Sequence, residues 1–500
     1  MGGSYKGNTF LEGISVSTGI PLDHINFVAS QVISLALAPL MQSVLHPSIT
    51  KLAARQTFVL IVGIFLGYFA FGIQIIHLVG LPLICYLLLR ILNPKIVQRW
   101  TMVVAIGYLS CIHLHRLFYS GAAYALDVTG PLMVMTQKIT SLAFNIHDGF
   151  SKDDLTPNQK YYAIKNIPTV LDYMSYIFHF QTLMAGPVVF YRDYRDFITG
   201  ANFLKPGTTL ADADLSQRDS YIKPDPFYPA LKKIAISVTF GVIFSVLKFP
   251  IEHAKDEEFF RSGIIYQMAY LYVATTTARY KYYHAWLLAD AINNISGLGF
   301  NGFTSDGKQK WDLISNVDIL GFEFGSSLRD CIQSWNILTN SWLRMVVYER
   351  VSKENGVFLT FTLSALWHGF HPGYYLTFAT GALFTVASRM VRKYVRPHFQ
   401  TSSNMRKFYD VLTCLFTRIL MTYLTFSFVL LEFWASIRIF WNMYCWLHIL
   451  ALFTIFVLPR FLGQSEAQLR NRLSKQGRFG YKLNLQIIYS MYKTFQIKLE

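Results

Sequence analysis

Charged residues are scarce in this sequence. Asp, Glu, Lys and Arg make up 15% of its 500 residues and hydrophobic residues 53%, whereas soluble domains carry about 25% charged residues. Long apolar windows recur along the whole chain, without the alternation expected of barrel strands. Because only helices and closed barrels satisfy their backbone hydrogen bonds in lipid, this composition excludes a soluble globular protein. It predicts an all-α, polytopic transmembrane protein.

Cysteine is also rare, with five residues and no C-x-x-C pair. Most of the cysteines lie in apolar stretches, so we interpret them as small core residues and expect neither a disulfide framework nor a zinc site. A D-H-H-C acyl-transfer signature is missing as well. His113 and His115 are two residues apart and do not share a helix face, so we expect no metal there.

The motifs of soluble enzymes are absent too. The sequence has no G-x-S-x-G elbow, no Walker loop, no H-E-x-x-H, and no G-x-G-x-x-G between a strand and a helix. Residues 1–21 are polar and Gly-rich without an apolar core, so we expect no cleavable signal peptide.

Basic residues outnumber acidic ones, which gives a formal net charge of +16. The bases cluster at residues 389–407 and in the tail after Pro459, as they do in the cytosolic segments of membrane proteins. We therefore expect no nucleic-acid partner. Two candidate spans separate the basic segments and put both on one side, which predicts a cytosolic C-terminus and a lumenal turn at His371-Pro372-Gly373.

The apolar windows predict the membrane spans and the domains. Candidate spans are 27–45, 57–72, 74–92, 100–118, 128–146, 169–190, 232–249, 263–280, 282–299, 356–370, 373–390, 410–431 and 440–458. Several are shorter than a straight span, so we expect about 10 or 11 crossings together with re-entrant or interfacial helices. We expect a polar N-terminal segment at 1–26, one integral membrane domain at 27–459 and a basic cytosolic tail at 460–500.

Two segments are too polar to be spans. Residues 191–228 are rich in Pro, Asp and Gly, which predicts an ordered surface loop with turns. Residues 324–350 have apolar residues at helical spacing interrupted by polar ones. This pattern predicts a helix that is tucked into the protein or lies at the interface.

His368 is an ionisable residue at the predicted membrane depth. It ends the apolar run that begins at Val357, in the stretch S-A-L-W-H-G-F-H-P-G-Y-Y. Ionisable groups at this depth are costly and usually face a cavity or a partner. Because an imidazole can accept a proton near neutral pH, the pattern indicates a general base. The alternative is a core histidine bonded to a backbone carbonyl.

Asn336, in S-W-N-I-L-T, is the second candidate. An amide can hold a substrate carbonyl or hydroxyl because it donates and accepts hydrogen bonds at once. The alternative for Asn336 is a hydrogen bond between helices.

Two further segments combine polar residues with apolar surroundings. On a helix over residues 282–300, Trp286, Asp290, Asn293 and Asn294 share one face, which indicates a wet cavity or an internal packing network. In residues 135–148 the stretch M-T-Q-K-I-T contains Gln137 and Lys138. A buried lysine there needs a partner or an anion.

Taken in order, these motifs resemble the membrane-bound O-acyltransferase (MBOAT) family, and within it the lysophospholipid acyltransferases. The shared stretches are T-Q-K-I-T-S-L-A-F-N-I-H-D-G, M-A-G-P followed by Y-R-D-Y-R-D-F, K-Y-Y-H-A-W-L-L-A-D-A-I-N-N, W-D-L-I-S-N, and S-A-L-W-H-G-x-x-P-G-Y-Y. The resemblance extends from Gly19 to Pro459. It is closest to the subgroup that acts on lysophosphatidylethanolamine and lysophosphatidylserine.

The resemblance implies an enzyme of phospholipid remodelling in the endoplasmic reticulum membrane, with its helices around a central catalytic chamber. A fatty acyl group would pass from acyl-CoA, as co-substrate, to the free hydroxyl of lysophosphatidylethanolamine, lysophosphatidylserine or lysophosphatidylcholine. His368 would be the base, and Asn336 would orient substrate or stabilise the oxyanion. Substrate-binding roles are expected for Trp367, Tyr375, Asp290, Asn293, Asn294, Gln137 and Lys138. No cofactor and no metal are expected, and self-association is left open.

Two alternatives remain at this point. A transporter or channel for lipids or small polar solutes would carry similar polar groups at mid-depth, although it would favour a repeat symmetry that the sequence lacks. Within acyl transfer, the alternatives are enzymes that acylate proteins or neutral lipids.

Overall fold

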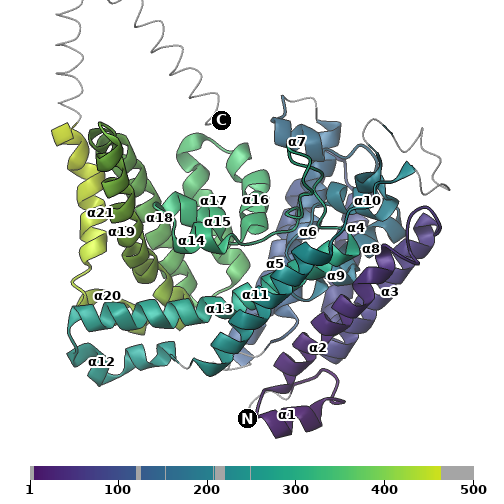
Figure 1. Ribbon diagram of the computed structural model, residues 1–500, viewed down its shortest axis with the longest axis horizontal. Coiled ribbons are helices and arrows are strands. Elements are labelled where there is room, and N and C mark those ends of the chain that lie inside the picture. The colour runs from purple at the N-terminus through teal and green to yellow at the C-terminus, as the bar shows by residue number, and fades with distance from the viewer. Residues whose placement is uncertain are drawn as a thin grey trace, which may run out of the picture. The chain divides into compact units, whose positions relative to one another are not determined.

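The computed structural model describes residues 5–119, 126–151, 154–205, 208, 220–247 and 249–462. Within these ranges the chain is helical, with isolated β-bridges as its only extended pairing (Figure 1). The predicted all-α class is confirmed. Most of the predicted tail at 460–500, and residues 206–207 and 209–219 of the predicted polar loop, lie outside the described residues.

The chain divides into two compact units, residues 1–382 with 414–443, and residues 383–413 with 444–500. The helices of the first unit are α1 (Glu12–Thr18), α2 (Leu22–Leu37), α3 (Leu52–Phe71), α4 (Ile75–Ile91), α5 (Val97–Tyr119), α6 (Thr129–Phe150), α7 (Pro157–Tyr162), α8 (Val170–Phe178), α9 (Phe180–Leu183), α10 (Tyr191–Thr199), α11 (Phe227–Val246), α12 (Glu257–Arg261), α13 (Ile264–Ser296), α14 (Ile319–Glu323), α15 (Leu328–Ser334), α16 (Ile337–Val346), α17 (Lys353–His368) and α20 (Phe433–Asn442). The single-turn 3-10 helices of this unit are η1 (Ala38–Met41), η2 (Gly72–Gln74), η3 (Ala201–Phe203), η5 (Ile251–Lys255) and η6 (Tyr348–Arg350).

The second unit contains η7 (Arg396–Phe399) and α21 (Trp446–Phe456). The helices α18 (Pro372–Tyr394) and α19 (Ser403–Leu430) each have one end in this unit and the other in the first. Inside the second unit, the rings of Phe384 and His448 lie 5.6 Å apart and those of Phe399 and Tyr409 5.1 Å apart.

Five helical stretches in the described residues are long and apolar enough to cross a membrane, or six if the two successive helices at 433–462 form one broken span. The predicted 10 or so crossings are therefore not reached by these stretches alone. Helices α6 and α13 are also long enough, with 22 and 33 residues. Their polar and charged residues lower their mean hydropathy, so they are not among these five stretches.

Helix α6 is the buried centre of the first unit. Every residue from Met135 to Ile146 is buried, and the helix packs against α4, α5, α8, α10 and α16. A helix that is buried on all sides lies inside the protein rather than at its surface. Its polar residues must therefore find partners on neighbouring helices.

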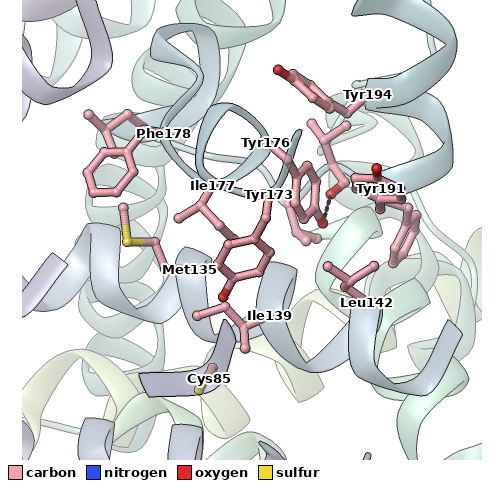
Figure 2. Close-up of a cluster of buried hydrophobic side chains, with 14 of the residues drawn as sticks. Cys85, Met135, Ile139, Leu142, Tyr173, Tyr176, Ile177, Phe178, Tyr191 and Tyr194 are labelled. Carbon is pink, nitrogen blue, oxygen red and sulfur yellow. Dashed lines mark hydrogen bonds between the residues drawn. The ribbon is translucent and has the colours of Figure 1, made fainter. Parts of the chain in front are cut away.

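Buried aromatic side chains join α6 to α8 (Figure 2). The ring of Tyr173 lies among Met135, Ile139 and other apolar side chains in this view, and its hydroxyl donates to the carbonyl of Pro82 at 3.0 Å. The hydroxyl of Tyr176 donates to the carbonyl of Val189 at 2.8 Å. Buried tyrosines thus contribute apolar area and keep their hydroxyl groups bonded.

Residues 263–280 and 282–299 form one continuous helix, α13, so the prediction of two spans was wrong. The hydropathy falls at its centre because Arg279 and Lys281 occur there, but no Gly or Pro interrupts the stretch. Arg and Lys have high helix propensity and do not end a helix, and Arg279 is paired because it donates to Glu323 at 2.9 Å. Arg279 is buried and its partner Glu323 is half-buried.

Three other predicted segments also differ in detail. The predicted span at 169–190 is divided into α8 and α9, and helix is excluded further on by Gly186, which has a φ of 66°, and by Pro187. The predicted loop at 191–228 begins with the half-buried helix α10. Residues 324–350 contain α15, α16 and η6 rather than one helix, because Asn336 takes a left-handed conformation between α15 and α16.

Candidate active site

His368 lies at the C-terminal end of α17, where the conformation of Gly369 ends the helix. Gly369 has a φ of 112°, which side chains other than glycine rarely adopt. A Cβ atom at position 369 would also lie 2.8 Å from Nδ1 of His113. The W-H-G sequence therefore needs its glycine for two reasons, the backbone turn and the close approach of α5.

Four aromatic rings surround the imidazole of His368. Their centroids lie at 4.6 Å for Trp367, 5.0 Å for Phe428, 5.3 Å for Phe378 and 5.6 Å for Tyr374. His368 is half-buried, and no side chain or backbone group of the described residues hydrogen-bonds to its ring. Both ring nitrogens can therefore bind a ligand or exchange a proton with one.

The hydrogen bond to a backbone carbonyl, considered above as the alternative for His368, is formed by His113 of α5 instead. Nε2 of His113 lies 3.1 Å from the carbonyl oxygen of Trp367, so Nε2 must carry the donated proton. Trp367 itself donates from Nε1 to the carbonyl of Met133 in α6 at 2.9 Å. The residue before His368 is therefore held from two helices.

Asn336 precedes α16 in a left-handed conformation, with φ 48° and ψ 51°. Asparagine tolerates this region better than most residues. On one side, Trp335 packs its ring against Trp286, Tyr283 and Phe322 at 5.0 to 5.8 Å. The half-buried side chain of Asn336 accepts a hydrogen bond through Oδ1 from Nδ2 of Asn316 at 3.0 Å.

One face of α6 holds both α16 and α17. Gln137 donates to Thr339 of α16 at 2.9 Å, and Thr140 accepts from Nε1 of Trp342 in α16 at 2.9 Å. The bond from Trp367 to Met133 adds α17 to the same face, since residues 133, 137 and 140 follow the spacing of one helix side. The rings of Trp342 and Trp367 meet at 5.9 Å.

This arrangement brings together the helix that begins after Asn336 and the helix that ends at His368. Trp342 is six residues, or about 9 Å along the axis, from Asn336, and Trp367 directly precedes His368. That the two side chains share one chamber stays a prediction.

The polar face predicted on α13 is buried. Asp290 forms an ion pair with Lys233 at 2.7 Å and accepts from Ser315 at 2.7 Å. Asn293 donates to the carbonyl of Ala289 at 2.7 Å. Oδ1 of Asn293 and both amide atoms of Asn294 have no partner among the described residues, and buried polar groups without a protein partner usually bind water or a ligand.

The remaining predicted binding residues have varied surroundings. Gln137 and Trp367 tie the helices together as described. Lys138 is buried and donates from Nζ to the carbonyls of Tyr176 and Ile177 at 3.3 and 3.1 Å, in the last turn of α8, where a cation is favourable. Tyr375 is 36% exposed and stacks on Phe370.

Sequence reasoning missed three residues of the site. Tyr374, rather than its neighbour Tyr375, contacts His368. Asn316 was noted only as part of the W-D-L-I-S-N stretch, and His113 only as an unsuitable metal ligand. A signal for His113 was available, because it is a second ionisable residue in an apolar segment.

A cavity of about 370 Å³ lies beside α16 in the first unit. It is lined by Asn158, Tyr162, Phe190, Leu338, Ser341, Arg344 and Glu349. Tyr162 donates to Asp193 of α10 at 3.3 Å. Burial raises the pKa of Asp193 to about 7 despite this bond, so the carboxyl group titrates near neutral pH.

His371 lies in the turn after α17, outside the helices. Burial and the positive charge of Arg116 lower the pKa of its imidazole below the ordinary value. His371 is therefore neutral at neutral pH and adds no charge beside His368.

Known proteins resemble this chain over most of its length. A model of the membrane-bound O-acyltransferase family matches residues 65–431, which include Asn336 and His368. Lysophospholipid acyltransferase 6 of Drosophila melanogaster is 48% identical over 471 residues, which cover 93% of this chain and 65% of the fly protein. The chain thus spans slightly less than two thirds of that relative.

Two mammalian relatives match over nearly their whole length. Membrane-bound glycerophospholipid O-acyltransferase 1 of Mus musculus is 38% identical over 94% of this chain and 96% of its own. Membrane-bound glycerophospholipid O-acyltransferase 2 of Homo sapiens is 37% identical over 91% of this chain and 88% of its own. This chain, a multi-pass membrane protein, therefore belongs to the membrane-bound O-acyltransferase family.

Proposed function

We propose that this protein transfers a fatty acyl group from acyl-CoA to the free hydroxyl of a lysophospholipid, as part of phospholipid remodelling. The observation that carries the proposal is the His368 imidazole, which has aromatic neighbours but no hydrogen-bond partner among the described residues. The names of the relatives, lysophospholipid acyltransferase and glycerophospholipid O-acyltransferase, support acyl transfer to a lysophospholipid. Membership of an acyltransferase family disfavours the transporter alternative.

In the proposed mechanism, His368 is the general base. A lipid hydroxyl is a poor nucleophile until a positioned base removes its proton during attack. As the hydroxyl oxygen bonds to the thioester carbonyl carbon, its proton passes to the imidazole. The carbon–sulfur bond then breaks, and the imidazolium returns that proton to the leaving thiolate. The products are the new ester and coenzyme A, and His368 is regenerated.

Asn336 is assigned to the carbonyl oxygen of the thioester. That oxygen carries negative charge when the tetrahedral intermediate forms, and an amide N–H can donate to it. A single donor of this kind contributes roughly 3–4 kcal/mol to catalysis. The transfer is direct in this scheme, without an acyl-enzyme intermediate.

The two substrates differ in how they reach a deep site. Coenzyme A carries several phosphate charges and cannot cross hydrocarbon, so acyl-CoA enters from the cytosol. The lysophospholipid enters sideways from the bilayer. We propose a cytosolic C-terminus, because the basic segments at 389–407 and beyond Pro459 follow the positive-inside rule. The endoplasmic reticulum membrane is proposed from the resemblance to the lysophospholipid acyltransferases.

The test uses membranes that contain the protein, labelled oleoyl-CoA and a panel of acceptors. The panel includes lysophosphatidylethanolamine, lysophosphatidylserine, lysophosphatidylcholine, diacylglycerol and an acceptor peptide. We expect labelled phospholipid, and the panel gives the head-group preference. Label in diacylglycerol or in the peptide alone, or in no acceptor, would overturn the proposal.

A further inference from the structure

Asn316, in the loop before α14, bonds to the start of α16 at three points. Its backbone carbonyl accepts from N of Ile337 at 2.9 Å. Its side-chain Oδ1 accepts from N of Leu338 at 3.1 Å, and its Nδ2 donates to Oδ1 of Asn336 at 3.0 Å. Asn316 is almost completely buried, at 2% exposure. It thus caps α16 from a separate segment of the chain, and it also contacts the side chain of Asn336.

These bonds determine which end of each amide faces which neighbour. The two ends of an asparagine amide look alike in shape, so their assignment rests on hydrogen bonds. The backbone N–H of Leu338 can only donate, so the atom of Asn316 that faces it must be the oxygen. The other end of that amide is then NH₂, which must face an acceptor, and this acceptor is the oxygen of Asn336.

The remaining end of the Asn336 amide is therefore its NH₂ group. No described residue accepts a hydrogen bond from Nδ2 of Asn336, so its two N–H groups are free to donate to a ligand. Were the amide turned by 180°, its oxygen would face the ligand instead. An oxygen there would repel a developing oxyanion, whereas N–H groups stabilise it.

The loop that carries Asn316 is itself held in position. Ser315 donates to Asp290, and Lys233 bonds to Asp290, to Ser315 and to the carbonyl of Trp311 at 2.7 to 3.2 Å. Val317 pairs with Trp335 in an isolated antiparallel bridge. The buried polar residues of α13 thus connect, through residues 315–317, to the backbone on both sides of Asn336.

We propose that Asn316 is a positioning residue that fixes the polarity of the Asn336 amide, so that Asn336 presents donors and not an acceptor to the reacting carbonyl. This inference rests on the proposed function. It explains why an asparagine lies at position 316, because the two ends of its amide accept from Leu338 and donate to Asn336 at the same time.

The test is N316D, measured in purified protein with both substrates varied. This variant keeps the size of the side chain and an oxygen for the N–H of Leu338, but offers Asn336 an oxygen in place of N–H. The Asn336 amide then turns to donate to the carboxylate. We expect kcat to fall by about 10²- to 10³-fold, with KM for each substrate within about twofold, since substrate binding uses other contacts.

The matched control is N301D. Asn301 lies in the same loop and donates to Asp312 at 2.7 Å, so the control loses one amide donor bond and gains one charge without touching Asn336. Its kcat should stay within about twofold of the unaltered protein, as changes distant from a site act independently.

Two further measurements distinguish a reversed Asn336 amide from damage to the fold. On an N336A background no amide remains to be turned, so N316D should lower kcat by no more than about twofold; misfolding would lower it in both backgrounds. Acidification should also raise the activity of N316D relative to the unaltered protein, because a protonated carboxyl regains a donor. Lys233 and Asp290, which hold the neighbouring Ser315, are present in both proteins.

The inference is overturned if N316D keeps its kcat, if it changes KM alone, or if its effect is equal in both backgrounds. These outcomes require an active unaltered protein. Failure of the proposed function itself would show as absence of transfer by the unaltered protein to every lysophospholipid, and is thus distinguishable.

Discussion

Among the buried and half-buried histidines, His368 has a distinct environment. His113 bonds to the carbonyl of Trp367, His179 lies within hydrogen-bond distance of Thr182, and His284 lies at 3.0 Å from Oγ of Ser237. Each of these rings has a structural partner. The ring of His368 lies against four aromatic rings and has no hydrogen-bond partner among the described residues, so its nitrogens are available for chemistry.

We therefore expect H368A to lose acyl transfer by at least 10²-fold, since a general base contributes about 10²- to 10⁴-fold. The measurement is initial rate with saturating oleoyl-CoA and lysophospholipid. The control H253A removes a histidine paired with Asp256 near the surface and should remain active. A variant H368A that keeps more than about a tenth of the activity would exclude the role of base.

Asp193 gives a prediction about stability and pH. Burial raises its folded-state pKa to about 7, above the value of about 3.9 in an unfolded chain. The folded state thus binds the proton more tightly, and its stability is greatest when Asp193 is protonated. Stability should fall as the pH rises from about 4 to about 7, by at most about 1.4 kcal/mol per pH unit from this group.

The measurement is the midpoint of thermal unfolding in detergent between pH 4 and pH 8. D193N should lack this part of the pH dependence and be more stable than the unaltered protein at pH 8. The control is D154N, because Asp154 is exposed. Identical pH profiles for D193N and the unaltered protein would contradict the prediction.

Single residues could be predicted from the sequence only where the local pattern was unusual. His368 and Asn336 interrupt apolar runs and were identified for that reason. His113, which bonds to the residue before His368, and Asn316, which bonds to Asn336, were not predicted, because no local spacing connects these segments. Tyr374 lies in the same motif as His368, where the sequence does not distinguish it from its neighbour Tyr375. His113 and Trp367 are 254 positions apart in the chain.

At the scale of elements, the face of α6 that holds α16 and α17 continues to an ion pair. Asp148 of α6 bonds to Arg350 of η6 through two N–H groups at 2.7 and 2.8 Å, and Arg350 lies over the ring of Phe144. The carboxylate of Asp148 is completely buried. Nδ1 of His147 also lies 3.2 Å from this carboxylate, but Arg350 supplies the permanent positive charge that balances it.

Breaking this pair should be costly. We expect R350L to lower the free energy of unfolding by about 3–5 kcal/mol, because the buried carboxylate of Asp148 would lose its partner. The matched control is R438L: Arg438 also bonds to a carboxylate, Glu257, through two contacts at 2.8 and 3.0 Å, but that pair is more than half exposed. R438L should cost no more than about 1 kcal/mol.

Unfolding in detergent, followed by tryptophan fluorescence against denaturant, compares the two variants. Equal losses of stability in R350L and R438L would mean that the burial of Asp148 does not determine the cost.

Elements were predictable to different degrees. The apolar runs located α3, α4, α5, α6 and α11 to within a few residues. The breaks between α8 and α9 and between α15 and α16 were not predicted. In both cases a hydropathy window averages over the one or two residues whose backbone conformation ends the helix.

At the scale of the whole molecule, the sequence predicts where the acyl donor enters. Residues 389–407 contain six basic residues, Arg389, Arg392, Lys393, Arg396, Arg406 and Lys407. In the structure they lie at the end of α18, in η7 and at the start of α19. We predict that they also attract the phosphates of acyl-CoA.

Neutralising Arg392, Lys393 and Arg396 together should raise KM for acyl-CoA by about threefold or more at low salt. The effect should shrink at physiological ionic strength, where exposed charges are screened within about 8 Å. KM for the lysophospholipid should not change. The control neutralises Arg90, Lys95 and Arg99, which are exposed bases at the end of α4, between the two helices and at the start of α5. Unchanged acyl-CoA kinetics at every salt concentration would mean that these bases only orient the protein in the membrane and do not attract acyl-CoA.

Helix α13 has a consequence for how this family can vary in sequence. Its 33 residues form one rod of about 50 Å, with Arg279 near its middle and Asp290 near its end. Inserting one residue near Thr275 would turn everything after it by about 100° relative to everything before it. Arg279 would leave Glu323 and Asp290 would leave Lys233 in a single step. In two helices joined by a loop, the loop could accommodate the extra residue without rotating the second helix. In one continuous helix, every side chain after the insertion is rotated about the helix axis. Natural relatives should therefore vary in length in the exposed turn at residues 301–310, ahead of the segment that holds Asn336, but keep the residue count of α13 constant.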